Sequence, residues 1–276
     1  MRIVKINKLF ESIVLEVINY VTPIKNTNRG RPSTYSNKTY LDAIFYVLKE
    51  GIGWNYIRGL CVTGDAIRKV YNKWVNMNVF QLSWRILLDI YSEFKLDFND
   101  VYIDASHIKN YMGTEVIGGN HYDRFRKATK ISIIVDDIGV PIGIHMDRSN
   151  VHDVKLAPKT IENINVPIDT TEYIIGDKGY ISSNLNDIIA NKYKAKLIVP
   201  RKKKYKIEGK IRGRKPKYEH KLKNRFVVER TYSWFKHYTI LFRRKDKKIS
   251  TFTSFIFMGA SNIIANKIMH VFSLVM

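Results

Sequence analysis

The stretch that decides the fold runs from residue 224 to residue 236 and reads NRFVVERTYSWFK. It contains no Gly or Pro and its apolar residues recur at helical spacing, so the pattern predicts a helix. Arg225, Glu229 and Lys236 fall near one face of that helix. The opposite face carries the residues expected to pack inward: Val227, Val228, Phe235 and Tyr238. Glu229 is then either the partner of Arg225 in a surface ion pair or one member of a larger site.

Five short apolar segments upstream of this helix predict strands. They cover residues 101–105, 131–135, 140–145, 173–176 and 195–200. The second and third strands are expected to form a hairpin turned at Gly139, and helices are predicted at 153–164 and 184–191. This alternation predicts an α/β fold, with a mixed sheet flanked by helices. Functional sites in such sheets gather where strands end.

The front third of the chain has a different pattern, with amphipathic periodicity throughout. Helices are predicted at 6–21, after Ser36, around 67–74 and at 80–94. We therefore expect a small all-helical domain over residues 1–98 and a second domain over 99–276. The helical domain is either a helix-turn-helix-like DNA-binding module, with Arg68 and Lys69 facing the DNA, or a plain packing domain.

The charge of the chain points to a polyanionic partner. The 276 residues include 47 Lys and Arg against 25 Asp and Glu, for a net charge of +22. Nucleic acid is the first candidate for such a partner. Between residues 194 and 248 there are 22 Lys and Arg against four acids, so this tract holds most of the excess. A basic insert at 201–220 is expected to bind the DNA backbone rather than to be a solvated run, through Arg201, Lys202, Lys203, Lys204, Arg212, Arg214 and Lys215.

Other classes of protein lack their signals in this sequence. Cys61 is the single cysteine, so a disulfide or a cysteine-based zinc site within one chain is excluded and a reducing compartment is expected. No secretory signal is visible, and the weakly charged stretch 249–266 predicts a buried terminal helix rather than a membrane span. Motifs of zinc proteases, P-loop enzymes and serine hydrolases are absent.

Three carboxylates can converge if the first and fourth predicted strands are neighbours in the sheet. Asp104 lies on the first strand, Asp177 just past the fourth, and Glu229 on the helix quoted above. Taken singly, Asp104 and Asp177 could also be ordinary turn residues. Converging carboxylates repel unless a cation lies between them, and Mg²⁺ prefers such oxygen ligands. We therefore predict that all three are catalytic and bind two divalent ions, Mg²⁺ or Mn²⁺ in its place, with Arg225 and Lys236 contacting DNA phosphate.

These residues resemble a known family. Arg225, Glu229 and Lys236 match the R-x3-E-x6-K signature of DDE transposases from bacterial insertion sequences, and the segments 102–106 and 175–180 resemble the strands that carry the two aspartates of that family. Further matches resemble the "insertion sequence five" group in particular: Gly30-Arg31-Pro32, Gly53-Trp54, Lys73-Trp74, Asp137-Ile138-Gly139-Val140-Pro141 and His152-Asp153. The family usually has Tyr where this chain has Leu222.

The resemblance implies a ribonuclease-H-like catalytic domain. It implies metal-dependent hydrolysis of DNA at the ends of an insertion sequence, followed by transfer of the freed 3′-hydroxyl into target DNA. A homo-oligomer, a dimer on paired ends, would work in the cytoplasm on the nucleoid, or in the nucleus of a eukaryotic host. Two alternatives stay open, a transposase-derived DNA-binding protein without catalysis and a ribonuclease-H-like nuclease without strand transfer.

Overall fold

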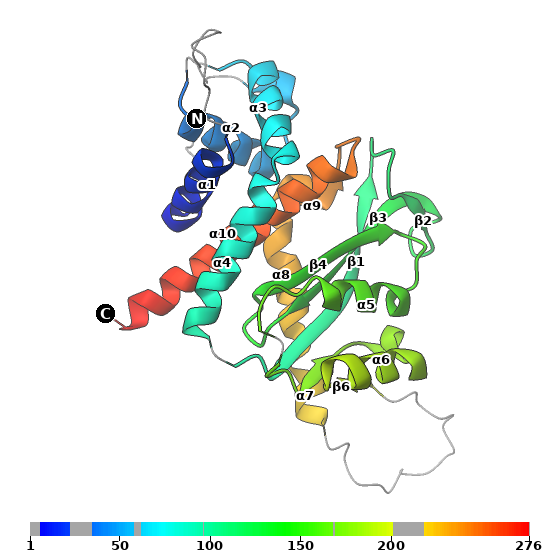
Figure 1. Cartoon of the computed structure of the whole chain (residues 1–276). Helices are drawn as coiled ribbons and strands as arrows, with labels where there is room; N and C mark the ends of the chain where they lie inside the picture. Colours follow the sequence, from blue (N-terminus) through cyan, green and yellow to red (C-terminus); the bar gives the residue numbers. More distant parts are fainter. Residues whose placement is uncertain are drawn as a thin grey trace, which may run out of the picture. The chain divides into compact units, whose positions relative to one another are not determined.

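The computed structural model describes residues 6–22, 35–57, 62–95, 97–167, 169–200 and 218–275 (Figure 1). For residues 271–275 it describes the backbone and not the side chains. Its contacts divide the chain into two compact units. The helical unit comprises Met1–Glu93, Ile108–Ile117 and Trp234–Met276, and the sheet unit comprises Phe94–His107 and Gly118–Ser233.

The sheet is mixed, as the sequence predicts. Its strands are β1 (Asp100–Asn110), β2 (Gly118–Asn120), β3 (Arg126–Val135), β4 (Pro141–Arg148), β5 (Tyr173–Ile175), β6 (Lys196–Ile198) and β7 (Arg243–Arg244). The order is β2-β3-β1-β5-β6, with β4 paired to β3 and β7 paired to β1. β1, β5 and β6 run parallel, whereas β3 and β4 form an antiparallel hairpin. The first and fourth predicted strands are therefore neighbours, as convergence of the carboxylates requires.

The hairpin between β3 and β4 is built around a buried acid. Asp136 is fully buried, and its Oδ1 accepts hydrogen bonds from the backbone N–H groups of Ile138 and Val140, at 3.1 and 2.8 Å. Lys95 neutralises the other carboxylate oxygen at 3.2 Å. Gly139 completes the turn with a φ of 89°, a conformation that residues with a Cβ rarely adopt. The turn predicted at this place is confirmed, and its geometry fixes the register of the hairpin.

Helices lie beside the sheet in the same unit. These are α5 (Asp153–Glu162), α6 (Ser183–Tyr193), the short α7 (Glu219–Lys223) and α8 (Phe226–Lys236), which continues past the unit boundary. α5 packs on β3 and β4, α6 packs on β6, and α8 runs alongside β1 (Figure 1). α5 begins at Asp153, as the sequence predicts, with Pro158 inside it. The apolar residues predicted to face inward from the region of α8 are all buried: Val227, Val228, Phe235 and Tyr238.

The helical unit contains α1 (Lys8–Val21), α2 (Asn37–Glu50), the single turn η1 (Trp54–Tyr56), α3 (Gly64–Asn76), α4 (Val79–Phe94), α9 (Thr239–Phe242) and α10 (Ile249–Val275). Ser36 caps α2 by accepting from the Thr39 N–H at 3.2 Å, and Gly51 ends it in a left-handed conformation, as the sequence predicts. The Tyr71 ring of α3 stacks on Phe255 of α10 at 4.5 Å. The front helices thus share one core with the last helix, so the compact units do not follow the boundary expected at residue 98.

Three details differ from the expectation. The helix expected over 224–236 begins two residues later, at Phe226, because the N–H groups of Val227 and Val228 donate to the carbonyls of Asn224 and Arg225 in a tighter turn. α2 ends at Glu50 and α3 begins at Gly64, a longer connection than the short turn of a typical helix-turn-helix. β2 and β7 are too short to leave a periodic signal. Among the described residues, no helix is both long and apolar enough to cross a membrane.

Candidate active site

The pairing of β1 with β5 brings two of the predicted catalytic residues together. Tyr102 pairs with Ile175 in parallel register. Asp104 and Asp177 each follow that pair by two residues, so both lie at the same edge of the sheet. The sequence prediction that these two aspartates approach one another is therefore supported by the register itself.

Asp104 lies in an acidic, poorly hydrated environment. Its side chain is 21% exposed. Burial is the main cause that raises the pKa of Asp104 to about 6; the nearby Asp177 and Asp153 act in the same direction, whereas the Ala105 backbone N–H and the Arg225 guanidinium oppose the rise. A carboxyl with a raised pKa among other carboxylates is typical of a site that receives a cation.

Asp177 is held by the turn that follows β5. It caps the short helical turn η2 (Lys178–Tyr180), and its Oδ1 accepts from the Gly179 N–H at 2.7 Å. A Cβ at position 179 would lie 2.9 Å from Asp177 Oδ1 and 3.3 Å from Asp153 Oδ2. Glycine at this position therefore lets Asp177 and Asp153 approach the same point from two sides.

Glu229 has a different partner from the two aspartates. Its side chain is 57% exposed, and Arg225 Nη2 donates to Glu229 Oε1 at 3.0 Å. Arg225 Nη1 also lies 3.9 Å from Asp104 Oδ2. The surface pair that the sequence left open is thus present, but its arginine also faces the sheet aspartate. Within the described part of the chain, no three His, Cys, Asp or Glu side chains are close enough to hold an ion as they stand.

Tyr232 links α8 to the strand of Asp104. Its hydroxyl lies 2.9 Å from the Asp104 carbonyl oxygen and 3.1 Å from that of Ile131. One helical turn separates Tyr232 from Glu229. The position of Glu229 relative to Asp104 therefore depends on this hydroxyl.

The β3–β4 turn holds the same helix at a second place. Thr231 Oγ1 donates to the Gly139 carbonyl at 2.7 Å, and Arg230 Nη2 donates to the Ile138 carbonyl at 3.0 Å. The sequence alone does not reveal the roles of Thr231 and Tyr232. Within a helical pattern, a Thr and a Tyr look like any other half-buried residues.

A fourth carboxylate, Asp153, was also missed. It opens α5, and Lys130 Nζ donates to Asp153 Oδ1 at 2.8 Å and to the Val151 carbonyl at 2.7 Å. Lys130 is almost completely buried on β3. From the sequence, residues 152–153 are a helix start and a match to the family, and Asp153 is assigned no role in the site. The signal that points to one is Lys130, since a lysine within the apolar run of β3 needs a buried partner.

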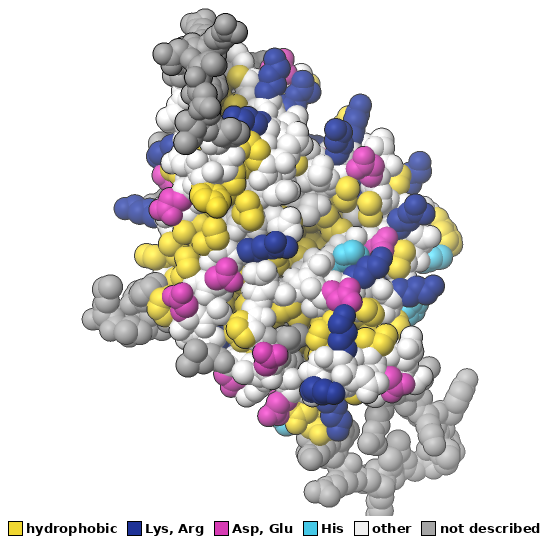
Figure 2. Space-filling view, viewed as in Figure 1, with side chains coloured by type: hydrophobic (Ala, Val, Ile, Leu, Met, Phe, Trp, Pro, Cys, Tyr) yellow, Lys and Arg dark blue, Asp and Glu magenta, His cyan; other side chains and the backbone are white. Residues whose placement is uncertain are grey.

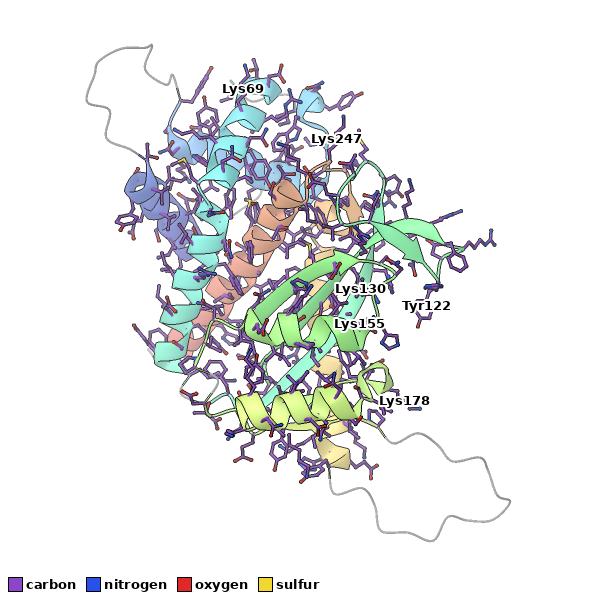
Figure 3. The ribbon with its side chains drawn as sticks, turned by 45° about the vertical axis from the view of Figure 1, so that its right-hand side comes forward. Lys69, Tyr122, Lys130, Lys155, Lys178 and Lys247 are labelled. Carbon is purple, nitrogen blue, oxygen red and sulfur yellow. The ribbon has the colours of Figure 1, made fainter. Side chains whose placement is uncertain are left out.

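Apart from Arg225, whose guanidinium faces Glu229 and Asp104, the predicted DNA-binding residues divide into three groups. Arg201, Lys202, Lys203, Lys204, Arg212, Arg214 and Lys215 lie outside the described residues. Arg68 and Lys69 are exposed on α3 of the helical unit, and Arg68 pairs with Asp65 at 3.0 Å. Lys236 is exposed at the end of α8. Within the sheet unit, Lys155, Lys178 and Tyr122 lie along one side (Figure 3), where Lys, Arg and His side chains gather on the surface (Figure 2).

Comparison with known proteins gives the family. A family model described as "Transposase DDE domain" matches residues 99–263. The chain belongs to this family. It is also similar to a protein of Burkholderia cepacia that is described as a candidate transposase for the insertion sequence element IS402, with 26% identity over 161 residues, 56% of this chain and 71% of the relative.

Membership of the family agrees with the architecture. The match begins at the start of β1 and extends into α10, so it includes Asp104, Asp177 and Glu229. The mixed sheet flanked by helices is the ribonuclease-H-like arrangement that the resemblance implied. The resemblance to the "insertion sequence five" group remains a prediction, since neither comparison names that group.

Proposed function

We propose that this DDE transposase cuts DNA at the ends of its insertion sequence and joins the freed 3′-hydroxyl to target DNA. The observation that carries the proposal is the placement of Asp104 and Asp177 on adjacent parallel strands, with Glu229 on a helix that Tyr232 ties to the Asp104 strand. A protein that only bound DNA would need none of these carboxylates in this arrangement.

Divalent cations suit the donor set at this edge of the sheet. Asp104 and Asp177 are oxygen donors that converge, and Asp104 has a raised pKa partly because its neighbours are acids. Mg²⁺ takes such ligands, and Mn²⁺ can replace it. We propose that Asp104, Asp177 and Glu229 hold two ions, which when bound would activate the attacking oxygen and stabilise the leaving oxygen of a phosphodiester.

The protein's own residues position these groups. Arg225 lies between Asp104 and Glu229, so moving its guanidinium to a DNA phosphate would release both carboxylates for a cation. Tyr232 fixes the helix of Glu229, and the buried Lys130 fixes Asp153 beside Asp177. Lys236, at the end of the same helix, is proposed to contact phosphate as well.

DNA recognition is assigned to the remaining basic surfaces. We propose that the helical unit recognises the element ends through α3, with Arg68 and Lys69 contacting the DNA. We also propose that the basic insert at 201–220 binds along the phosphate backbone of the DNA. A homo-oligomer, a dimer on paired ends, would bring two such sites together on the chromosome. The net charge of +22 supports a polyanionic partner of this kind.

One experiment separates this function from its alternatives. The full chain is incubated with Mg²⁺, a DNA fragment that carries the flanks of its own gene, and a supercoiled target plasmid. The proposed function predicts 3′-hydroxyl ends at the element boundaries and joined products in the plasmid. Binding without cutting would indicate a DNA-binding descendant of a transposase, and cutting without joining would indicate a nuclease.

A further inference from the structure

The turn between β2 and β3 is a rigid support for exposed rings. We call residues 121–127 the tip. Asn120 is buried below it; its carbonyl accepts from the N–H groups of Asp123 and Phe125, at 3.1 and 2.9 Å, and its Oδ1 accepts from the Tyr122 N–H at 3.0 Å. The turn is thereby closed by three hydrogen bonds to a single residue. Its conformation is set before any partner binds.

Two residues of the tip have left-handed backbone conformations. The φ angles of Arg124 and Phe125 are 48° and 58°. Such angles are unfavourable for residues with a Cβ, by an amount on the order of 1 kcal/mol each, and they persist where the surroundings impose them. A turn of ordinary sequence would have Asn or Gly here. Large side chains at strained positions indicate that the side chains themselves are needed.

The tip displays aromatic rings to solvent. Tyr122 is 89% exposed and Phe125 is 66% exposed. The Phe125 ring lies edge-on to His121 at 4.7 Å, and the Tyr122 ring lies 5.7 Å from the ring of His107. Single exposed hydrophobic residues are common on protein surfaces, but two aromatic rings on one fixed turn form a surface suited to stacking.

The charges around these rings favour an anionic partner. The tip contains three cations, Arg124, Arg126 and Lys127, and one acid, Asp123, and all three cations are exposed. Aromatic rings with basic residues among them are the arrangement by which proteins bind unpaired nucleic acid, since bases stack on the rings while phosphates meet the cations. A protein partner for an apolar patch would not need this excess of positive charge.

The tip is close to the candidate active site. His107, whose ring lies beside Tyr122, follows Asp104 on β1 by three residues and is close enough to Asp153 for that carboxylate to act on its pKa, as Asp153 also does on the pKa of Asp104. From the other side, β3 leads from the tip to Lys130, the partner of Asp153. Figure 3 shows Tyr122 on the same side of the sheet unit as Lys155 and Lys178, which lie at the starts of α5 and η2.

We propose that the tip binds unpaired DNA bases next to the cleavage position, with Tyr122 stacked on one base and the tip cations contacting the flanking phosphates. This inference rests on the proposed function, because it names the form of DNA that the same site receives. Where a DNA end opens locally so that one strand enters the catalytic edge, the base that leaves its stack requires a new surface. Tyr122 offers that surface on a support that does not need to reorganise.

The test uses a forked duplex with an unpaired 2-aminopurine at the junction, and the fully paired duplex of the same sequence as the reference. Binding of the full chain is measured in EDTA by 2-aminopurine fluorescence and by anisotropy. Wild-type protein should bind the fork more tightly than the duplex and quench the fluorescence. Tyr122→Ala should bind the fork about tenfold more weakly without quenching it, because stacking on one base is worth about that factor. Tyr122→Phe, which keeps the ring, should behave as wild type.

The matched control is Tyr193→Ala, a half-exposed tyrosine at the end of α6 in the same unit. It should leave fork binding and quenching unchanged. Equal binding and equal quenching by Tyr122→Ala and wild type would overturn the proposal, as would an equal loss in the Tyr193→Ala control. Because these measurements contain no divalent ion, a failure of DNA cleavage would count against the proposed function and not against the tip.

Discussion

Replacement of Tyr232 by Phe should separate the positioning of Glu229 from the stability of the fold. The change removes one hydroxyl, which lies 2.9 and 3.1 Å from the carbonyls of Asp104 and Ile131, and keeps the ring. Loss of this buried hydrogen bond should cost about 1–2 kcal/mol. For a chain of this size the melting temperature should fall by roughly 2–8 °C. Because α8 is then less firmly held against β1, we expect DNA cleavage to fall by about 10–100-fold while end binding stays within about twofold.

The assay compares cleavage under single-turnover conditions well below the melting temperature. The control is Tyr71→Phe, which removes another buried tyrosine hydroxyl that donates to a backbone carbonyl, that of Thr251 at 2.5 Å. This control should lose a similar amount of stability and cut at the wild-type rate. A folded Tyr232→Phe protein that cuts as fast as wild type would refute the positioning role, and so would an equal loss of cleavage in both variants.

Three further predictions concern charge. Changing Arg201, Lys202, Lys203 and Lys204 to Ala should make the plot of log binding constant against log salt concentration less steep, by roughly 0.9 for each phosphate that the insert no longer neutralises. An unchanged slope would show that the insert is not part of the DNA interface. Arg244→Met should destabilise the protein by at least about 3 kcal/mol in a denaturant titration, because the buried guanidinium donates to the carbonyls of residues 115, 246 and 247. Burial raises the pKa of Asp246 to about 6, so the contribution of this carboxyl to stability is fully present below its unfolded pKa of about 4 and is lost as the pH rises through about 6. Asp246→Asn should flatten this dependence in thermal melts, and an unchanged profile would contradict the assignment.

Strands and caps were predictable because their signals are local. The apolar runs of β1, β3 and β5 are short and fit a buried strand better than any other element. Ser36 and Gly51 mark the two ends of α2, Ser36 through its side-chain hydroxyl and Gly51 through its left-handed backbone. Asp104 and Asp177 could be brought together from the sequence because parallel strands meet at one edge. These inferences needed only periodicity and topology.

Contacts between distant residues were not predictable. The ion pair of Lys130 with Asp153 and the hydrogen bond of Tyr232 to the Asp104 carbonyl depend on how α5 and α8 are placed on the sheet. The start of α8 at Phe226 depends on a turn in which Val227 and Val228 donate to Asn224 and Arg225, and the ends of helices are the part of a pattern that sequence defines least sharply. The grouping of α10 with the front helices required knowledge of which apolar faces meet, as Tyr71 meets Phe255.

The most direct test of the account is the rate of DNA cleavage by Glu229→Gln, measured in Mg²⁺ and in Mn²⁺ on the element ends. Gln keeps the size of the side chain but cannot neutralise a divalent ion. We predict a folded protein that binds the ends at least as well as wild type and cuts them slower by several orders of magnitude. Asp104→Asn, and the double variant with Glu229→Gln, should show about the same loss, because groups that act as a unit are not additive. Cleavage by Glu229→Gln near the wild-type rate would contradict the account and leave Glu229 as the surface partner of Arg225.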